Sequence, residues 1–346
     1  MTVIGVLGGA GTVGRVVADR LGAHTLRVGG RALDRAAAAC TTPDSTPMRV
    51  DLHDPHSLAE FCSGCEVVVN CAGPSYQVLD LVARAALTAG AHYVDAAGDL
   101  VALDALGDPP GHRAAVFSAG LMPGLSGLLP RLLATGPLAR LDIYVGGAAR
   151  IGELSAVDAL LTRGPRFGLA LAAWRDGEIV PGALKPLRSV SLPGFRGQVH
   201  AWPFLSAETS RLAAELDIGE LRNHTVYVTE SVPRALAAAW ADDGPLERHV
   251  PEVVAAAEAD LAATGPYYTM LFQAVPRDPV PGVPRRLILR TPDSYALSGV
   301  VAALTAIDVL DGRIKPGAHL AAEVLDPSAV LDRLRSDPLV TGVELL

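Results

Sequence analysis

Three glycines near the start of the chain have the spacing of a nucleotide-binding loop. Gly9, Gly11 and Gly14 form the pattern G-x-G-x-x-G, which follows an apolar run and precedes a segment with helical periodicity. In that context glycines allow a tight turn, a close approach of the backbone to a pyrophosphate, and close packing of the helix on the strand. We predict that the loop binds a dinucleotide, with Thr12 and Val13 at the amino end of the helix receiving its phosphates. The alternative is a glycine-rich turn without a ligand.

The residues after the second predicted strand indicate which dinucleotide binds. A loop that prefers NAD carries an acidic residue about 20 positions after the glycines, where it binds the ribose 2′-hydroxyl. Here the sequence reads Gly29-Gly30-Arg31. A guanidinium beside glycines has room for a 2′-phosphate and binds it with several donors, so the pattern favours NADP. Asp34 is a rival ribose ligand, and Arg31 could instead be a solvated loop residue.

The spacing of apolar residues predicts the elements that hold this loop. Over the first third of the chain, short β-rich runs alternate with segments of helical periodicity, which is typical of a doubly wound parallel sheet with helices on both faces. The predicted strands are residues 3–7, 25–28, 48–50, 67–70, 92–95 and 114–117, and the predicted helices between them are 13–21, 33–39, 55–62 and 77–89. The expected fold class is α/β, with a Rossmann-type sheet at the amino end.

Ligands of open α/β sheets bind beyond the carboxyl ends of the strands, so residues at those ends are candidate contacts. By this rule we expect Asp51, at the end of the third strand, to accept a hydrogen bond from the adenine. We expect the backbone of Cys71, Ala72 and Gly73 to border the nicotinamide ribose. For Asp51 the equally good alternative is that it caps the helix that begins at Pro55.

Hydride transfer to a double bond also requires a proton donor. Tyr76, Asp95 and Asp99 follow the fourth and fifth predicted strands and are the catalytic candidates on this rim. Asp95 could instead accept backbone N–H groups of its own turn. Further candidates lie in the middle of the chain, namely Arg196, His200, Tyr267 and Tyr268.

After Pro123 the pattern changes to a mixture of helices and short strands, which predicts a second, α+β domain. Its first helix, near residues 125–133, contains Pro130 and should be kinked there. A long amphipathic helix over residues 294–311 is expected to return to the first domain. We predict an NADP-binding Rossmann domain over residues 1–122, an inserted substrate and dimerisation domain over 123–292, and returning C-terminal helices over 293–346.

Composition excludes several classes of function. The 346 residues carry a formal net charge of −8 and contain no basic block, so nucleic acid is not an expected partner. Cys62 and Cys65 form one CxxC pair without a second pair at matching spacing, so no metal site is expected. The chain shows neither a basic leader nor an apolar run long enough to span a bilayer, and we expect a cytoplasmic protein.

Further stretches resemble the saccharopine dehydrogenase family in its reductase branch. They are residues 70–74, 89–95 and 119–126, the Gly29-Gly30-Arg31 turn, and the C-terminal helix with residues 312–317 after it. The resemblance covers both ends of the chain but not its middle. It implies an NADP-dependent oxidoreductase, often a homodimer through its second domain, that reduces the imine formed by an amino acid and a carbonyl compound.

Two features leave the small-molecule substrate open. Met122 stands where opine-forming members of the family carry an acidic residue before the Pro-Gly pair. The segment Gly73-Pro74-Ser75-Tyr76 is similar to trans-acting enoyl reductases, which implies reduction of an activated C=C bond instead. A non-catalytic NADPH-binding sensor or scaffold would keep the glycine loop but lack a proton donor.

Overall fold

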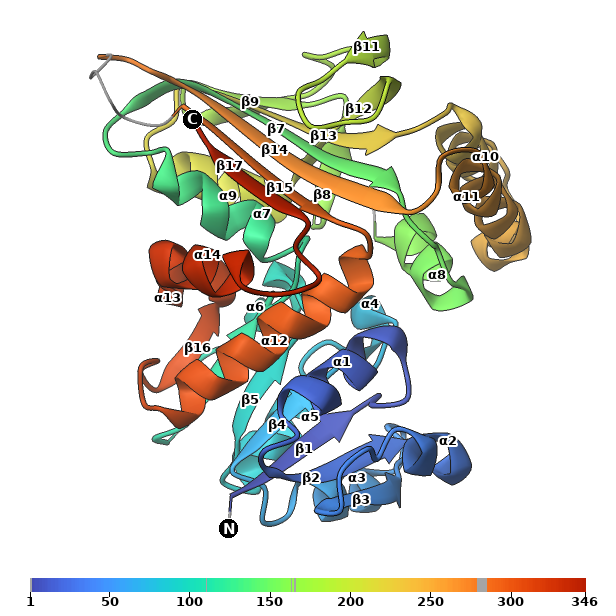
Figure 1. Cartoon of the computed structure of the whole chain (residues 1–346), viewed down its shortest axis with the longest axis vertical. Helices are drawn as coiled ribbons and strands as arrows, with labels where there is room; N and C mark the ends of the chain where they lie inside the picture. The colour runs from blue at the N-terminus through green and yellow to red at the C-terminus, as the bar shows by residue number, and fades with distance from the viewer. Residues whose placement is uncertain (1, 110, 163, 165, 279–284) are drawn as a thin grey trace. The chain divides into compact units, whose positions relative to one another are not determined.

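The computed structural model describes residues 2–109, 111–162, 164, 166–278 and 285–346 (Figure 1). The chain divides by its contacts into two compact units. Unit 1 is Met1–Leu128 with Tyr295–Asp326, and unit 2 is Leu129–Ser294 with Pro327–Leu346. The predicted boundaries after residues 122 and 292 lie near this division, and the boundary after Asp326 falls inside the predicted segment 293–346.

Within the described residues, unit 1 is built on a seven-stranded parallel sheet in the order β16-β6-β5-β4-β1-β2-β3. Its strands are β1 (Val3–Leu7), β2 (Thr25–Gly30), β3 (Ser45–Arg49), β4 (Val67–Asn70), β5 (His92–Asp95), β6 (Ala114–Phe117) and β16 (Gly317–Leu320). The central strands are apolar along almost their whole length because helices cover both faces of the sheet. The predicted Rossmann-type α/β fold is confirmed.

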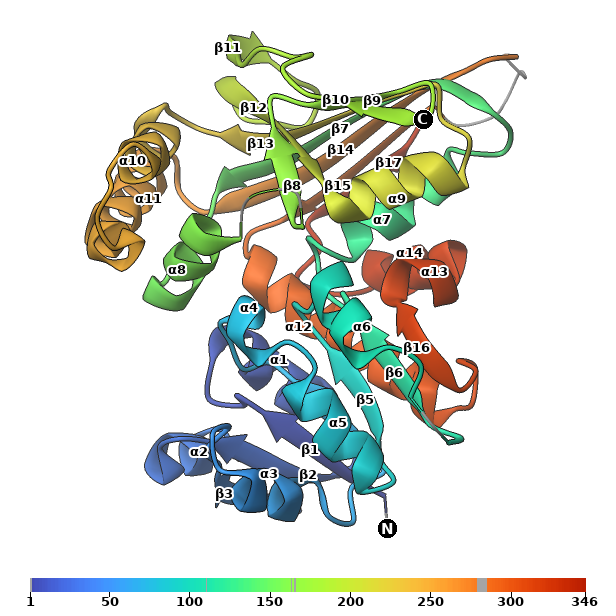
Figure 2. The same ribbon diagram turned by 180° about the vertical axis from the view of Figure 1, so that it is seen from behind.

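The helices of unit 1 lie on the two faces of this sheet. In Figure 1, α1 (Thr12–Arg20) and α12 (Ser294–Leu310) lie in front of the sheet. In Figure 2, which shows the opposite side, α3 (Pro55–Cys62), α5 (Leu81–Thr88) and α6 (Leu100–Leu106) lie in front. α2 (Leu33–Ala38) packs on β2 and β3. Gly299 of α12 packs so closely on α1 that an added Cβ would lie 2.6 Å from the Val13 carbonyl oxygen.

Three details of unit 1 differ from the sequence prediction. The helix predicted over residues 77–89 is two helices, α4 (Ser75–Val78) and α5, because Leu79 adopts a φ of 44°, which a right-handed helix excludes. The helix α6 and the strand β16 were not predicted. The helix predicted near residues 125–133 consists of α7 (Leu125–Leu128) and a 3₁₀ helix, Leu129–Leu132, which contains Pro130.

Unit 2 contains a mixed sheet of ten described strands with the main order β10-β9-β13-β7-β14-β15-β17; β12 pairs with β13, and β11 and β8 pair with β12. The strands are β7 (Leu138–Ala148), β8 (Gly168–Ala170), β9 (Ala173–Arg175), β10 (Glu178–Val180), β11 (Leu187–Ser191), β12 (Gln198–Ser206), β13 (Glu220–Tyr227), β14 (Tyr267–Pro276), β15 (Arg286–Thr291) and β17 (Gly342–Leu345). The second unit is therefore α+β, as predicted.

The helices of unit 2 pack mainly at one end and on one face of its sheet. α8 (Glu153–Leu161), α10 (Ser231–Trp240) and α11 (Val250–Thr264) share one apolar cluster. The remaining helices of the chain are α9 (Ala207–Glu215), the 3₁₀ helix Leu246–His249, α13 (Ala321–Val324, in unit 1) and α14 (Pro327–Arg335). No described helix is both long and apolar enough to cross a membrane.

Candidate functional site

The glycine loop connects β1 to α1 at the carboxyl edge of the unit 1 sheet. The backbone N–H groups of Gly8 and Gly9 donate to the Gly29 carbonyl at 2.9 and 3.2 Å, which joins the loop to the end of β2. An added Cβ on Gly14 would lie 2.3 Å from the Gly8 carbonyl oxygen, so this glycine is needed for packing. Gly11 is exposed, and its added Cβ would meet only the Gly8 carbonyl oxygen, at 3.3 Å. The backbone at Gly11 is therefore open to a ligand.

The amino end of α1 suits a negatively charged group. The first amides of a helix have no acceptor within the helix, and the helix dipole is positive at this end. Gly11 is the N-cap without a side-chain hydrogen bond, and the first turn contains no acidic residue. Thr12 is exposed and Val13 is half-buried. The N–H groups of this turn can therefore receive a pyrophosphate, as predicted for the motif.

Arg31 follows β2 directly and is exposed. Among the described residues it has no hydrogen-bond or ion-pair partner, so its guanidinium is free to bind a phosphate. Gly30 beside it leaves open space, since nothing lies within 4 Å of an added Cβ. The rival residue Asp34 lies in the first turn of α2, where a carboxylate is stabilised by the helix dipole.

Asp51 lies in the turn between β3 and α3. Its Oδ1 accepts from the His53 N–H at 2.9 Å, and its own N–H donates to the Ser57 hydroxyl at 3.2 Å. The N-cap of α3 is Asp54, which accepts from the His56 N–H at 2.9 Å. The alternative that Asp51 caps this helix is therefore wrong, and Asp51 is an exposed turn residue at the carboxyl edge of the sheet.

The segment Cys71-Ala72-Gly73 lies against the glycine loop. The Cys71 N–H donates to the Leu7 carbonyl at 2.8 Å, and an added Cβ on Gly8 would lie 2.7 Å from the Ala72 nitrogen. Burial raises the pKa of the Cys71 thiol, so Cys71 is neutral rather than a nucleophile. The structure thus brings together the two backbone segments that the sequence assigned to the dinucleotide.

Asp95 accepts four hydrogen bonds and is buried. Its Oδ2 accepts from the Tyr93 hydroxyl at 2.5 Å and from the Asn70 amide at 3.1 Å, and its Oδ1 accepts from the N–H groups of Ala97 and Gly98 at 2.9 and 2.7 Å. Burial, together with Asp95, raises the pKa of Tyr93 well above its ordinary value, so Tyr93 stays protonated as the donor. The bonds from Ala97 and Gly98 are those expected from the alternative role of Asp95, in which it accepts the backbone N–H groups of its own turn.

The other two catalytic candidates, Tyr76 and Asp99, are half-buried. Asp99 is the N-cap of α6 and accepts from the Val101 N–H at 3.0 Å. Burial raises the pKa of Asp99, which favours the protonated form of this half-buried carboxyl. Tyr76 lies in the short helix α4, and its hydroxyl accepts an exposed hydrogen bond from the Gln77 side-chain amide at 2.8 Å.

Asn70 links Asp95 to the backbone at Ala72, and it was not among the predicted site residues. Its side-chain N–H donates to Asp95, and its side-chain oxygen accepts from the Ala72 N–H at 3.1 Å. It is 1% exposed at the carboxyl end of β4. A polar residue that ends an otherwise apolar strand was the signal that could have identified it.

The candidates in the middle of the chain all lie in unit 2. The Arg196 guanidinium lies 4.7 Å from the centre of the Tyr267 ring and also donates to the Thr264 carbonyl at 3.1 Å. His200 lies on β12 with its Nδ1 3.9 Å from a Glu230 oxygen, and Tyr268 lies on β14.

Residues 4–114 match the family model described as the saccharopine dehydrogenase NADP binding domain. This segment is similar to that domain. The match confirms the predicted family resemblance, NADP as the cofactor, and the class of NADP-dependent oxidoreductases. The features of the NADP binding domain fit this cofactor, since the loop is open at Gly11 and Arg31 is unpaired at the end of β2.

Two solved structures resemble this chain over all or nearly all of its length. Saccharopine dehydrogenase (L-Glu forming) from Saccharomyces cerevisiae has 16% identity and a TM-score of 0.69 over 100% of both chains. The DAP dehydrogenase of C. glutamicum, in complex with DAP, has 14% identity and a TM-score of 0.49 over 97% of this chain and 99% of the other. The first likeness shows that both units share the fold of the yeast enzyme. No curated protein matches the chain by sequence.

Proposed function

We propose that the protein is an NADPH-dependent reductase of a small-molecule C=N bond. The observation that carries the proposal is the NADP binding domain, with an open glycine loop and an unpaired Arg31. Support for the C=N bond comes from the family resemblance, and from the likeness over the whole chain to saccharopine dehydrogenase (L-Glu forming).

The proposed cofactor contacts are those of the carboxyl edge in unit 1. Gly9, Gly11 and Gly14 shape the loop, and the amides at Thr12 and Val13 receive the pyrophosphate. Arg31 pairs with the 2′-phosphate, Asp51 accepts from the adenine, and the backbone of Cys71, Ala72 and Gly73 borders the nicotinamide ribose. NADPH, when bound, supplies the hydride.

The proposed proton donors are Tyr76 and Asp99. A donor has to keep its proton at the working pH and reach the substrate atom beside the one that receives hydride. A tyrosine hydroxyl keeps its proton at neutral pH, and burial raises the pKa of Asp99. Asp95 has all its acceptor positions in use, so we assign it a positioning role, through Asn70, on the backbone at Ala72.

The alternative substrate is an activated C=C bond on an acyl group. The observation that favours it is the segment Gly73-Pro74-Ser75-Tyr76, which leads from β4 into α4 and is similar to trans-acting enoyl reductases. Both reactions use the same cofactor contacts, so only the substrate distinguishes them.

The experiment is a direct comparison of the two substrate classes with the full chain. NADPH oxidation is followed with amino acids mixed with aldehydes or 2-oxo acids, and with enoyl thioesters, and Gly11→Val serves as the cofactor-free control. With deuterated NADPH, C=N reduction places deuterium on a carbon bonded to nitrogen, whereas C=C reduction places it on an acyl chain. If the protein binds NADPH tightly but oxidises it with neither class of substrate, that result contradicts the proposed reductase activity.

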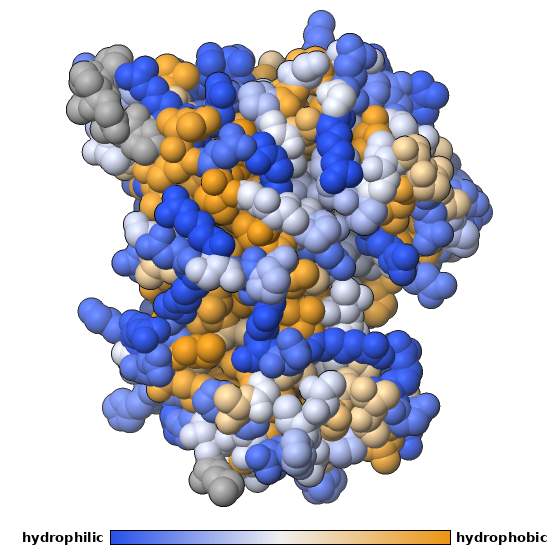
Figure 3. Space-filling model, in the orientation of Figure 1, coloured by the Kyte–Doolittle hydropathy of each residue, from blue (hydrophilic) through white to orange (hydrophobic). Residues whose placement is uncertain are grey.

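We also propose that the protein is a cytoplasmic homodimer without a nucleic-acid partner. Support comes from the family resemblance and from the net charge of −8. Figure 3 shows apolar area among charged side chains over β14, β15 and β17, and Val275 and Leu346 there are 41% and 62% exposed. Size-exclusion chromatography with light scattering should give twice the mass of one chain. The mass of a single chain would exclude the dimer.

A further inference from the structure

One tryptophan of unit 2 has an unpaired indole N–H. Trp174 and Trp240 donate theirs to the carbonyl oxygens of Ile218 and Leu160, each at 3.1 Å. The indole N–H of Trp202, on β12, is buried and has no acceptor among the described residues. A buried donor without a partner costs about 1–3 kcal/mol, and an indole N–H can only donate. The Trp202 indole N–H is therefore available to donate a hydrogen bond to an acceptor atom of a ligand.

His200 lies beside Trp202 on the same face of the sheet. The two residues are two positions apart on β12, so their side chains point to the same side. The His200 Nδ1 is also buried, and no described residue accepts from it or donates to it; the nearest Glu230 oxygen lies at 3.9 Å. Two neighbouring polar groups on one strand face are thus left unpaired by the protein.

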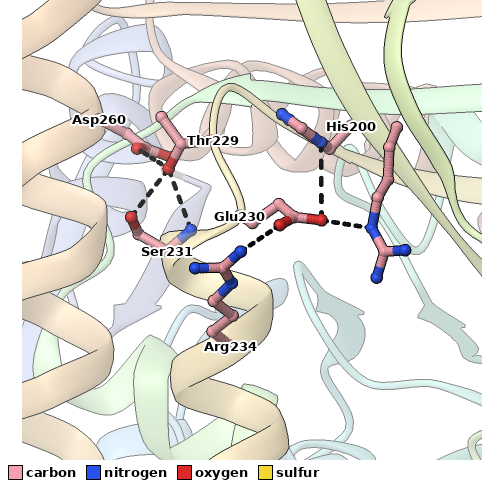
Figure 4. A network of polar contacts seen from close by, with 7 residues as sticks. His200, Thr229, Glu230, Ser231, Arg234 and Asp260 are labelled. Carbon is pink, nitrogen blue, oxygen red and sulfur yellow. Dashed lines mark hydrogen bonds and ion pairs between the residues drawn. The ribbon is translucent and has the colours of Figure 1, made fainter.

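Two arginines complete the group. Figure 4 shows His200 and Arg234 pointing toward the Glu230 carboxylate. The Arg188 Nε and the Arg234 Nη2 each donate to Glu230 at 2.5 Å, which lowers the pKa of Glu230 and keeps it ionised. The Arg188 guanidinium also lies over the Trp202 ring, 5.9 Å from its centre. Glu230 therefore anchors both cations, and one of them, Arg188, lies over the Trp202 indole.

The exposure of these side chains shows which donors remain for a ligand. The Glu230 side chain is 18% exposed, whereas those of Arg188 and Arg234 are 63% and 75% exposed. Each guanidinium carries five N–H donors, and Glu230 accepts from one on each arginine. The three charges sum to one positive charge, which a single carboxylate would neutralise, and a planar guanidinium matches a carboxylate better than a spherical ion.

We propose that Arg188, Trp202 and Arg234, held by Glu230 and flanked by His200, form a binding site for a small carboxylate. One oxygen of the ligand accepts from the Trp202 indole N–H, and the guanidinium donors hold the carboxylate charge. All five residues lie in unit 2, so the inference goes beyond the proposed reductase activity and does not depend on it.

The test uses the full chain without a nucleotide. Propionate and its neutral analogue propionamide are titrated by ligand-observed NMR at an ionic strength held constant with sodium chloride. We expect saturable binding of propionate and none of propionamide, because only the carboxylate carries a negative charge, which the net positive charge of Arg188, Arg234 and Glu230 attracts. Equal binding of both compounds, or no saturable binding of propionate, overturns the proposal.

Variants then assign the binding to these residues. Arg188→Gln and Trp202→Phe should each weaken propionate binding about tenfold or more, as expected for loss of a hydrogen bond to a charged group. Arg277→Gln is the matched control, because Arg277 is an exposed arginine of unit 2 that pairs with exposed Asp217. An unchanged affinity in Arg188→Gln, or an equal loss in Arg277→Gln, overturns the site.

A stability measurement tests the unpaired indole without any ligand. Trp174→Phe leaves the Ile218 carbonyl oxygen without its donor, whereas Trp202→Phe removes an N–H that has no acceptor. We expect a smaller loss of unfolding free energy for Trp202→Phe than for Trp174→Phe. An equal loss would show that the Trp202 N–H is used by the fold, which also overturns the proposal.

Discussion

The Tyr93 hydroxyl donates to the Asp95 carboxylate at 2.5 Å, and the two residues stand two positions apart on the buried strand β5. Asn70 of the neighbouring strand β4 donates to the same oxygen. The network ends at the Ala72 N–H, within the segment assigned to the nicotinamide ribose. A buried polar network that is fully paired holds its members in one arrangement, so this one supports the cofactor edge of the sheet.

The first prediction concerns this network. Asp95→Asn places a side-chain N–H group where hydrogen-bond donors already point, and it removes the charge that these donors stabilise. We expect a loss of about 3 kcal/mol or more in the free energy of unfolding, measured in urea. Tyr93→Phe removes a single donor and should cost about 1.5 kcal/mol. A fully stable Asp95→Asn protein with lost turnover would instead make Asp95 a catalytic residue.

The second prediction concerns cofactor preference. Arg31→Ala should weaken NADPH binding by roughly tenfold to a hundredfold, because it removes a charge-assisted hydrogen bond to the 2′-phosphate. NADH lacks that phosphate, so its affinity should stay nearly unchanged. Arg113→Ala is the control, since Arg113 pairs with Glu66 near the amino ends of the strands. Titration of both nucleotides decides the matter, and equal losses for the two would remove Arg31 from the 2′-phosphate site.

The third prediction separates binding from packing within the glycine loop. Gly11→Val should abolish binding of either nucleotide while the fold persists, because Gly11 is exposed and only one protein atom approaches its added Cβ. Gly14→Ala should lower the melting temperature, since its Cβ would lie 2.3 Å from the Gly8 carbonyl oxygen. Calorimetry and thermal unfolding measure the two effects. Retained affinity in Gly11→Val would mean that the loop is only a turn.

The fourth prediction identifies the proton donor. Tyr76→Phe or Asp99→Asn should lower turnover by about two orders of magnitude with NADPH affinity preserved, the typical contribution of a general acid. Asparagine also caps helices, so Asp99→Asn keeps the start of α6.

The pH dependence of turnover distinguishes the two candidates. Burial raises the pKa of Asp99, and an acid donates only while protonated, so turnover should fall as the pH rises through that raised value. In Asp99→Asn, turnover should no longer show this fall with rising pH. If both variants turn over at the wild-type rate at every pH, the donor lies in unit 2, with His200 and Tyr268 the next candidates.

The fifth prediction concerns stability in acid. His224 is 3% exposed and stacks on Tyr144 with ring centres 4.7 Å apart, and burial lowers its pKa from 6.5 to about 4. Between these values the unfolded chain binds a proton that the folded chain does not. Stability should therefore fall as the pH drops from 6.5 to 4, by on the order of 3 kcal/mol at 1.36 kcal/mol per pKa unit.

A variant isolates the contribution of this imidazole. His224→Phe keeps an aromatic ring beside Tyr144 and cannot bind a proton, so its stability should depend less on pH across this range. Urea unfolding at three pH values from 7 to 4.5 compares the two proteins. Identical pH dependence in both would assign the acid sensitivity to other groups.

Local sequence patterns were sufficient for much of unit 1. β1, β4, β5 and β6 have the predicted bounds, because an apolar run between turn residues is recognisable without its neighbours. β16 was missed because residues 317–320 become a strand only by pairing with β6, roughly 200 positions earlier in the chain. The break at Leu79 was missed for a related reason, since a helical apolar pattern continues across it.

The sequence by itself determined the cofactor edge of this protein, and the tertiary structure decided what its polar side chains do. Glycine spacing and the arginine after β2 are local features, so they indicated NADP before any fold was known. The hydrogen bond between Asn70 and Asp95, and the indole N–H of Trp202 that has no acceptor among the described residues, depend on which distant segments the fold brings together. Hydrogen bonding acts only over about 3 Å, whereas its partners can stand anywhere in the sequence, so these roles require the folded chain.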